Sequence, residues 1–159
     1  MRWSLLAAAA AFALGGAVVA APRPADDKKD EKKDEKLFEF PDLEAKEWKK
    51  QDNGMKVWDV KEGKGDAAKA GAKVKVNYVG WLTDGKKFDS SIDRKEPISF
   101  GLGQVIKGWQ EGVPGMKPGG VRRLVIPPEL AYGKRGAGKD IPADATLVFV
   151  IEYLGPGDE

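Results

Sequence analysis

Apolar and polar residues alternate along the larger, C-terminal part of the chain, which predicts a series of β-strands. In residues 73–81, Lys-Val-Lys-Val-Asn-Tyr-Val-Gly-Trp, the side chains of Val74, Val76 and Tyr78 fall on one face of an extended strand. The turn Thr-Asp-Gly-Lys at 83–86 closes this strand. The predicted strands cover residues 55–60, 73–81, 98–100, 121–126 and 146–153.

One segment breaks the alternation and predicts the only helix of any length, from Val105 to Gly112. Within it, Trp109 follows Val105 and Ile106 at helical spacing and can lie against both. A helix of two or three turns is too short to be stable alone, so packing must hold it. Several strands and one short helix predict an α+β domain in which an antiparallel sheet wraps on that helix.

The first twenty residues predict an export signal. Arg2 is followed by a mostly apolar run that ends in small residues, and we expect cleavage after Ala20. An uncleaved membrane anchor is the alternative, but the run has fewer than the ~18 apolar residues that a membrane span needs.

A charged segment follows, and we expect residues 21–50 to be a largely disordered spacer. Residues 26–36 alternate pairs of acidic and basic residues, so a helix there would place like charges four residues apart with nothing apolar to bury. Residues 37–48 are more apolar and could either dock on the domain or form a short helical turn. Residues 51–155 then have the size of one folded domain, with 156–159 as a short tail.

Composition excludes most enzyme mechanisms. The chain of 159 residues has no histidine and no cysteine, which rules out Ser-His-Asp and Cys-His nucleophiles, disulfides, and His or Cys metal sites. We therefore expect no metal and no cofactor. The net charge is +2, from 27 basic and 25 acidic residues, and gives no field of one sign that would attract nucleic acid.

The candidate chemistry lies in a possible apolar pocket. Residues 127–145 are rich in proline and glycine, and a loop of that length predicts a functional segment overhanging a pocket. Taken singly, Trp109 is explained as core and Asp89 as a turn residue. Together with Phe88 and Tyr132, they indicate a pocket with aromatic walls and few polar groups, which suits a compact apolar group such as a proline ring.

Successive segments of the chain resemble the signature segments of the FKBP-type peptidyl-prolyl isomerases, in the same order and at similar spacing. The resemblance covers residues 53–154 and implies a half-open antiparallel sheet curled around one short helix, with catalysis of rotation about X-Pro bonds without covalent chemistry. The segments are Tyr-Val-Gly-Trp-Leu-Thr-Asp-Gly-Lys-Lys-Phe-Asp-Ser-Ser at 78–91, Val-Ile-Lys-Gly-Trp at 105–109, Leu-Ala-Tyr-Gly at 130–133 and Ala-Thr-Leu-Val-Phe at 145–149.

The resemblance also implies roles for individual residues. Trp109 would form the floor beneath the proline ring, and the Ile106 amide and the Tyr132 hydroxyl would donate hydrogen bonds to substrate carbonyls. Asp89 would be held by Tyr78 and Arg94 and would face the carbonyl of the rotating bond. The implied catalytic residues are Phe88, Asp89, Trp109, Tyr132 and Phe149, and the implied substrate-binding residues are Tyr78, Arg94, Ile98, Val105, Ile106 and Ile141.

Two positions depart from the best-known eukaryotic members of this family. Ile98 stands where they have an aromatic wall, and Ala137 where they have a histidine. Neither change removes one of the polar roles, so both bear on substrate preference and inhibitor affinity and not on activity.

The expected partners are proline-containing polypeptides, above all unfolded or folding exported proteins, with macrolides of the FK506 class as inhibitors. We expect no nucleic acid, no stable membrane association, and a monomer, because residues 22–47 are too few and too charged for the long helices of dimeric relatives. The C-terminal residues carry no lumenal retention signal, which favours a bacterial periplasmic or secreted protein. The alternative is a binding module or holdase chaperone with the same pocket and no useful catalysis; the retained polar residues favour the enzyme.

Overall fold

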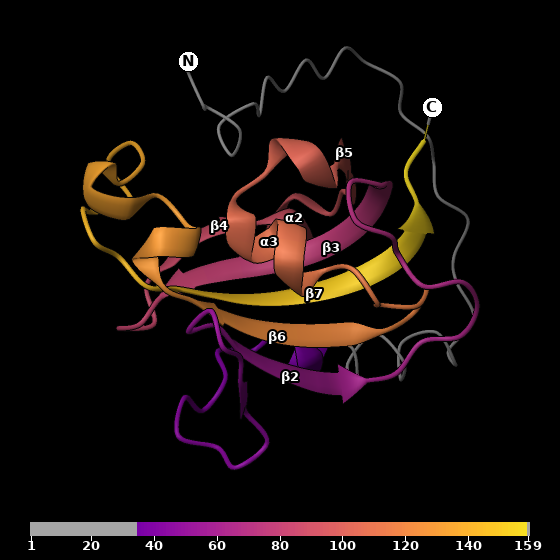
Figure 1. Ribbon diagram of the computed structural model, residues 1–159, viewed down its shortest axis with the longest axis horizontal. Coiled ribbons are helices and arrows are strands. Elements are labelled where there is room, and N and C mark those ends of the chain that lie inside the picture. Colours follow the sequence, from indigo (N-terminus) through magenta and orange to yellow (C-terminus); the bar gives the residue numbers. More distant parts are fainter. Residues whose placement is uncertain (1–34, 159) are drawn as a thin grey trace.

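A computed structural model describes residues 35–158 and places one short helix, α3, on a twisted antiparallel sheet (Figure 1). The strands are β1 (Lys49–Lys50), β2 (Lys56–Lys61), β3 (Lys73–Leu82), β4 (Lys87–Ser90), β5 (Ile98–Gly101), β6 (Val121–Ile126) and β7 (Leu147–Pro156). The α-helices are α2 (Ser91–Arg94) and α3 (Lys107–Gly112), and the 3₁₀ turns are η1 (Leu102–Gln104), η2 (Pro128–Leu130) and η3 (Gly133–Arg135). The expected export signal, residues 1–20, lies outside the described residues.

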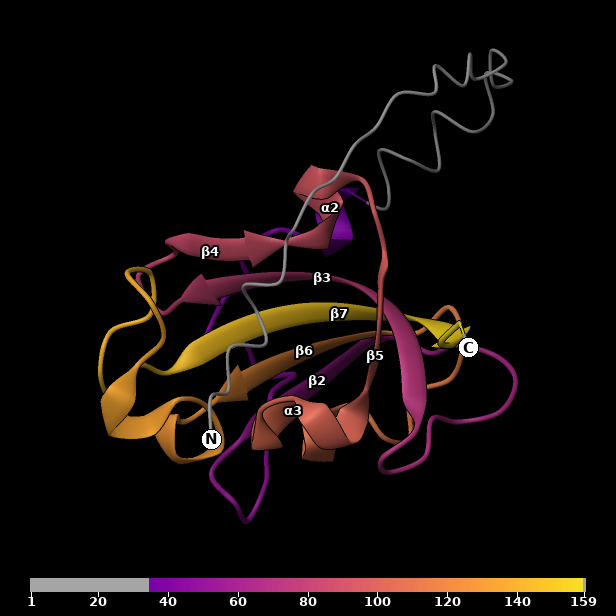
Figure 2. The ribbon, with the colours of Figure 1, turned by 90° about the horizontal axis from the view of Figure 1, so that it is seen from above.

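The sheet has the order β1-β2-β6-β7-β3-β4, and all of its pairings are antiparallel. On the edge opposite β7, strand β3 has two partners in turn. It pairs with β5 from Lys73 to Val76 and with β4 from Val79 to Trp81. Figure 2 shows the chain passing from α2 through β5, along the curved first part of β3, to reach α3. The predicted α+β fold, a half-open antiparallel sheet around one short helix, is confirmed.

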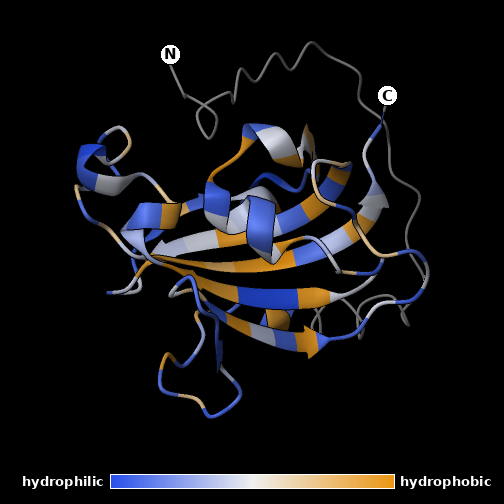
Figure 3. Cartoon of the chain, in the orientation of Figure 1, coloured by the Kyte–Doolittle hydropathy of each residue, from blue (hydrophilic) through white to orange (hydrophobic). Residues whose placement is uncertain are grey.

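Both faces of the central strands are buried. Tyr78 and Phe149 lie in the core on the side of α3, whereas Val79, Trp81 and Val150 belong to a second apolar cluster on the other face. The bands of apolar residues on β3 and β7 are visible in Figure 3. A strand buried on both faces reads as a continuous apolar run. The alternation that predicted β3 thus holds only for its first half, and something must cover the back of the sheet.

Residues 37–48, the N-terminal strap, provide this cover. Leu37, Phe38 and Leu43 are partly buried against the second cluster. At the far end of the strap, the Trp48 ring meets the Trp58 ring edge to face, with centroids 5.5 Å apart. The sequence left open docking on the domain or a short helical turn; these residues dock, and a short helical turn at residues 35–37 begins the segment.

The helix begins later than its sequence predicts. Val105 and Ile106 were expected in its first turn, but α3 starts at Lys107, and Ile106 is extended with φ −56° and ψ 149°. The Gln110 side chain donates to the Val105 carbonyl oxygen at 2.7 Å, which holds this extended pair against the helix. Strands β1 and β4 and helix α2 were not predicted, because each is short and carries few apolar residues.

Two glycines let α3 approach β6 closely. A Cβ atom on Gly108 would lie 2.4 Å from Cγ2 of Ile126, and one on Gly112 would lie 2.7 Å from Cδ1 of Leu124. Real Cβ contacts are essentially never so short, so these two positions require glycine for space. Glycine at these two positions lowers the helix propensity of α3 but allows the helix to pack closely on β6.

The first prediction concerns Gly108→Ala. Alanine favours a helix by ~1 kcal/mol over glycine, but an added methyl in a packed interface costs ~1–3 kcal/mol. We expect a net loss in the free energy of unfolding of up to about 2 kcal/mol, measured by urea denaturation. Gly103→Ala is the control, because nothing lies within 4 Å of its added Cβ. A Gly108→Ala protein more stable than wild type would contradict this packing.

The second prediction concerns the strap. In the double variant Phe38→Ala/Leu43→Ala, we expect the free energy of unfolding to fall by about 2–3 kcal/mol, because each side chain is only partly buried. These residues lie on the face opposite α3, so any activity at the α3 face should be unchanged per folded molecule. An unchanged unfolding midpoint would show that the strap contributes nothing to stability.

Candidate functional site

A cavity of about 710 Å³ opens between α3, β5 and the loop that follows β6. Its lining is mostly apolar, and charged side chains are confined to Lys73, Lys107 and Glu129. The long loop contributes Ala131 and Tyr132, as its composition predicted. The predicted site residues on the lining are Tyr78, Ile98, Val105, Ile106, Trp109 and Tyr132.

Trp109 forms the base of the cavity and is held by three other rings. Its centroid lies 5.3 Å from that of Tyr78 and 5.3 Å from that of Phe149, both edge to face, and 5.4 Å from that of Phe100. Edge-to-face contacts at such distances are the favoured geometry of aromatic pairs. Only 3 % of Trp109 is exposed, so it belongs to the core and to the cavity at once.

Some predicted wall residues lie behind the cavity and not on its lining. Phe149 is fully buried beneath Trp109 and meets Phe88 edge to face at 5.6 Å. Ile141 is buried in the core, in a bridge with Ala137. Phe149 comes from the central strand β7 and contacts Trp109, whereas Phe88 comes from the edge strand β4 and contacts Phe149, so the two rings support the floor. A Cβ atom on Gly80 would lie 2.7 Å from both phenyl rings, so this layer has no room for another side chain.

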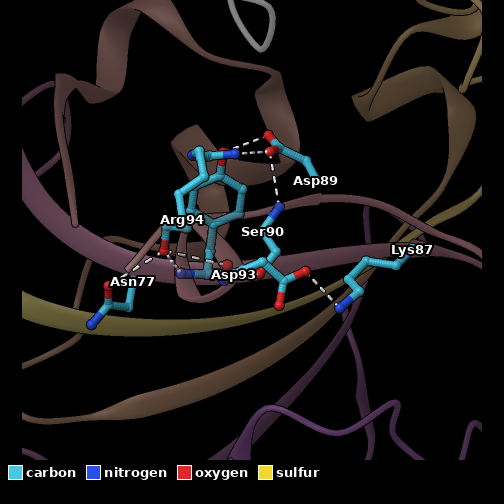
Figure 4. A network of polar contacts seen from close by, with 8 residues as sticks. Asn77, Lys87, Asp89, Ser90, Asp93 and Arg94 are labelled. Carbon is cyan, nitrogen blue, oxygen red and sulfur yellow. Dashed lines mark hydrogen bonds and ion pairs between the residues drawn. The ribbon is translucent and has the colours of Figure 1, made fainter. Parts of the chain in front are cut away.

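Asp89 is held by hydrogen bonds from several neighbours (Figure 4). The Tyr78 hydroxyl donates to Oδ2, Arg94 Nη1 donates to Oδ1 at 2.6 Å, and the Ser90 amide donates to Oδ1 at 2.9 Å. Arg94 Nη2 also donates to the Tyr78 hydroxyl at 3.1 Å. The bond to Asp89 is the main cause that raises the pKa of Arg94. Asp89 and Arg94 thus lie beside the cavity, joined to its lining through Tyr78.

The Tyr132 hydroxyl and the Ile106 amide are hydrogen-bond donors on the lining, and neither has an acceptor among residues 35–158. Burial, and then the nearby Asp89 charge, raise the pKa of Tyr132 to about 12. Burial, and then its bond to Asp89, also raise the pKa of Tyr78. Both phenols therefore stay protonated at neutral pH and can donate.

The lining includes residues that sequence reasoning missed. Phe100 packs on Trp109, Gln110 fixes the Val105 carbonyl, and Gln104 lies at the rim. A signal for Phe100 existed, because it is two residues from Ile98 on β5 and so shares its face. Nothing in the sequence distinguishes the glutamines from ordinary surface residues.

The site can hold a ligand but offers no covalent chemistry. Among the described residues, no group of three or more acidic side chains could hold a metal ion. An apolar floor, two donors and a fixed carboxylate suit a compact apolar ring flanked by carbonyl groups. This fold and site define a class of small α+β domains that bind peptide segments without forming a covalent bond to them.

Comparison with known proteins narrows this class. The sequence model described as "FKBP-type peptidyl-prolyl cis-trans isomerase" matches residues 64–154. An "FK506-binding protein" of Neisseria meningitidis serogroup B is 53% identical over 103 residues, which are 64% of this chain and 94% of that protein. The chain belongs to the FKBP-type peptidyl-prolyl cis-trans isomerase family, enzymes that catalyse rotation about X-Pro bonds, as its sequence motifs predicted.

Two solved structures of similar sequence share this fold. The crystal structure of FkpA from Escherichia coli has a TM-score of 0.67 and 44% identity, covering 84% of this chain and 62% of that one. A peptidyl-prolyl cis-trans isomerase from Pseudomonas syringae pv. tomato has a TM-score of 0.66 and 33% identity, covering 87% of this chain and 100% of that one.

The third prediction is a flat pH profile. The chain has no histidine or cysteine. Because its raised pKa keeps the Tyr132 hydroxyl protonated until the pH approaches about 12, this donor is present throughout the neutral range and is lost only as the pH rises through that value. We expect kcat/KM for a proline peptide to be constant between about pH 5.5 and pH 9, a range that includes the ordinary histidine pKa of about 6.5.

The uncatalysed rate, measured at each pH, is the control for this profile. A step in kcat/KM inside the range would show that a titrating group takes part.

Proposed function

We propose that the cavity binds the proline ring of an X-Pro segment against the Trp109 indole and lowers the barrier to rotation of the preceding peptide bond. That barrier is ~18–20 kcal/mol in water. The observation that carries the proposal is the Trp109 indole, fixed by three rings at the base of an apolar cavity with two free donors on its lining.

The proposed chemistry stabilises the twisted amide relative to the planar one. Resonance in the planar amide places partial negative charge on the carbonyl oxygen, and water stabilises this charge better than an apolar cavity does. Asp89, beside that carbonyl, would oppose the same charge. The Tyr132 hydroxyl and the Ile106 amide would donate to substrate carbonyls and hold the chain in the twisted geometry.

The remaining residues would shape and support the pocket. Val105 and Ile98 are proposed as apolar contacts of the substrate, with Ile98 setting a preference different from that of relatives with an aromatic wall. Phe149 would act through Trp109, which it holds from below, Phe88 would support Phe149, and Ile141 would support the long loop. Tyr78 and Arg94 would fix the orientation of Asp89.

The proposed substrates are proline-containing polypeptides that fold after export. The proposal rests on the apolar run in residues 1–20, and the relatives compared above include bacterial proteins. We place the enzyme in the bacterial periplasm or outside the cell, as a monomer with one catalytic domain. Within residues 35–158, no helix has the length and apolar character that a membrane crossing requires. Macrolides of the FK506 class would compete for the cavity, because a relative bears the name of an FK506-binding protein.

The fourth prediction tests the role of Asp89. In a protease-free assay with a proline tetrapeptide, Asp89→Asn should lower kcat/KM by ~10- to 100-fold, because it removes a fixed charge and an acceptor of Arg94 and Tyr78. Asp93→Asn is the matched control, because Asp93 lies on α2 and pairs with Lys87 at 2.7 Å, away from the cavity lining.

Three outcomes are informative. Equal activity of Asp89→Asn and Asp93→Asn would show that Asp89 takes no part in catalysis. A wild-type chain that bound the peptide without accelerating its isomerisation would favour the holdase or binding module. Inhibition of wild-type turnover by FK506 would support the proposal that macrolide and proline substrate bind in the same cavity.

A further inference from the structure

A row of side chains on β6 supports the whole length of α3. Alternate side chains of β6 point to opposite faces of the sheet. The face that carries α3 holds Arg122, Leu124 and Ile126, and the other face holds Val121, Arg123 and Val125. Ile126 packs against Gly108, and Leu124 packs against Gly112. Arg122 is the next side chain in the row and reaches the end of the helix.

Arg122 binds the C-terminal end of α3. Its Nη1 atom donates to the Gly112 carbonyl oxygen at 2.8 Å and to the Pro114 carbonyl oxygen at 3.3 Å. The last carbonyls of a helix have no partner within it, and a cation there also interacts favourably with the helix dipole. Only 16 % of the Arg122 side chain is exposed, so water cannot fully replace these bonds.

The guanidinium is itself held by the neighbouring strand. Asp59 on β2 is the cross-strand partner of Arg122 on β6, and its Oδ1 atom accepts from Arg122 Nε at 2.5 Å. A second contact acts on the same end of α3, where the Asn53 side-chain amide donates to the Glu111 carboxylate. The end of the helix is therefore tied to the sheet by polar bonds with defined directions.

The other end of α3 carries the parts of the site. Trp109 stands between the two glycines that pack on β6, and the Ile106 amide precedes the first helical residue. Only six residues long, α3 carries Trp109 three residues before Gly112, so a shift at Gly112 displaces the site as well. The contacts with Leu124 and Ile126 set how close the helix lies to β6, whereas the directional bonds of Arg122 set where its end lies along the strand.

We propose that Arg122 is a positioning residue of the isomerase site, setting the location of the Trp109 indole and the Ile106 amide through its hold on the end of α3. This inference rests on the proposed function of the cavity. Arg122 does not touch the substrate, and it lies beyond the cavity lining. Its effect on rate is exerted through the helix, since a small misplacement of binding groups lowers the rate substantially.

The test compares Arg122→Met with Arg123→Met. The two arginines are neighbours on β6, and their side chains point to opposite faces of the sheet. On the strap side, the Arg123 Cζ atom lies 4.5 Å from the centroid of the Trp58 ring. Both variants lose a partly buried guanidinium, so both should lose stability. We expect only Arg122→Met to lower kcat/KM per folded molecule, by ~10-fold and mainly through kcat.

A spectroscopic readout separates positioning from stability. In nitrogen-15 NMR spectra, the indole N–H signal of Trp109, assigned by its absence in Trp109→Phe, should shift in Arg122→Met and stay in place in Arg123→Met. The Trp58 signal should show the reverse. Arg122→Lys keeps the charge but replaces the planar fork of guanidinium donors by one ammonium group, so its kcat/KM should lie between those of the wild type and Arg122→Met.

The outcomes distinguish this inference from the function on which it rests. A wild-type chain without isomerase activity would overturn the proposed function. An active wild type together with an equally active, folded Arg122→Met protein would overturn the positioning role alone. If Arg122→Met does not fold, Arg122→Lys carries the test, and unchanged kcat/KM with an unshifted Trp109 signal would overturn the role.

Discussion

The packing of α3 on β6 is the contact on which the rest of this molecule depends. A six-residue helix has no stability of its own, so its position is set entirely by what it touches. Gly108 and Gly112 bring it close to the sheet, and Trp109, between them, is gripped by rings from β3, β5 and β7. The floor of the cavity and the Ile106 amide both follow from that single placement.

The two faces of the sheet have separate tasks. The face under α3 builds the cavity, whereas the back is closed by the N-terminal strap through Leu37, Phe38 and Leu43. Strand β6 serves both, since consecutive arginines leave it in opposite directions, Arg122 toward the helix and Arg123 toward Trp58. Cover on the back face secures the sheet without entering the site, so the strap contributes to stability and not to the cavity lining.

Sequence reasoning reached the long strands and the floor of the site, because both have strong patterns. Alternation located β3, β6 and β7, and glycine spacing drew attention to Trp109. It misplaced the start of α3, because Val105 and Ile106 stand at helical spacing from Trp109 while their backbone is extended. The Asp89 network could not be derived from spacing. Its members come from β3, β4 and α2, which only the folded sheet brings together.

The way Asp89 is held has a consequence for how this enzyme can be controlled. Its two oxygens already accept hydrogen bonds from Tyr78, Arg94 and Ser90, so three neighbours fix the position of the carboxylate beside the cavity. The donors beside it are a phenol and a backbone amide, and the chain has no histidine or cysteine. The site therefore has neither a thiol nor an imidazole, the side chains through which redox state or pH near neutrality most often acts on an enzyme.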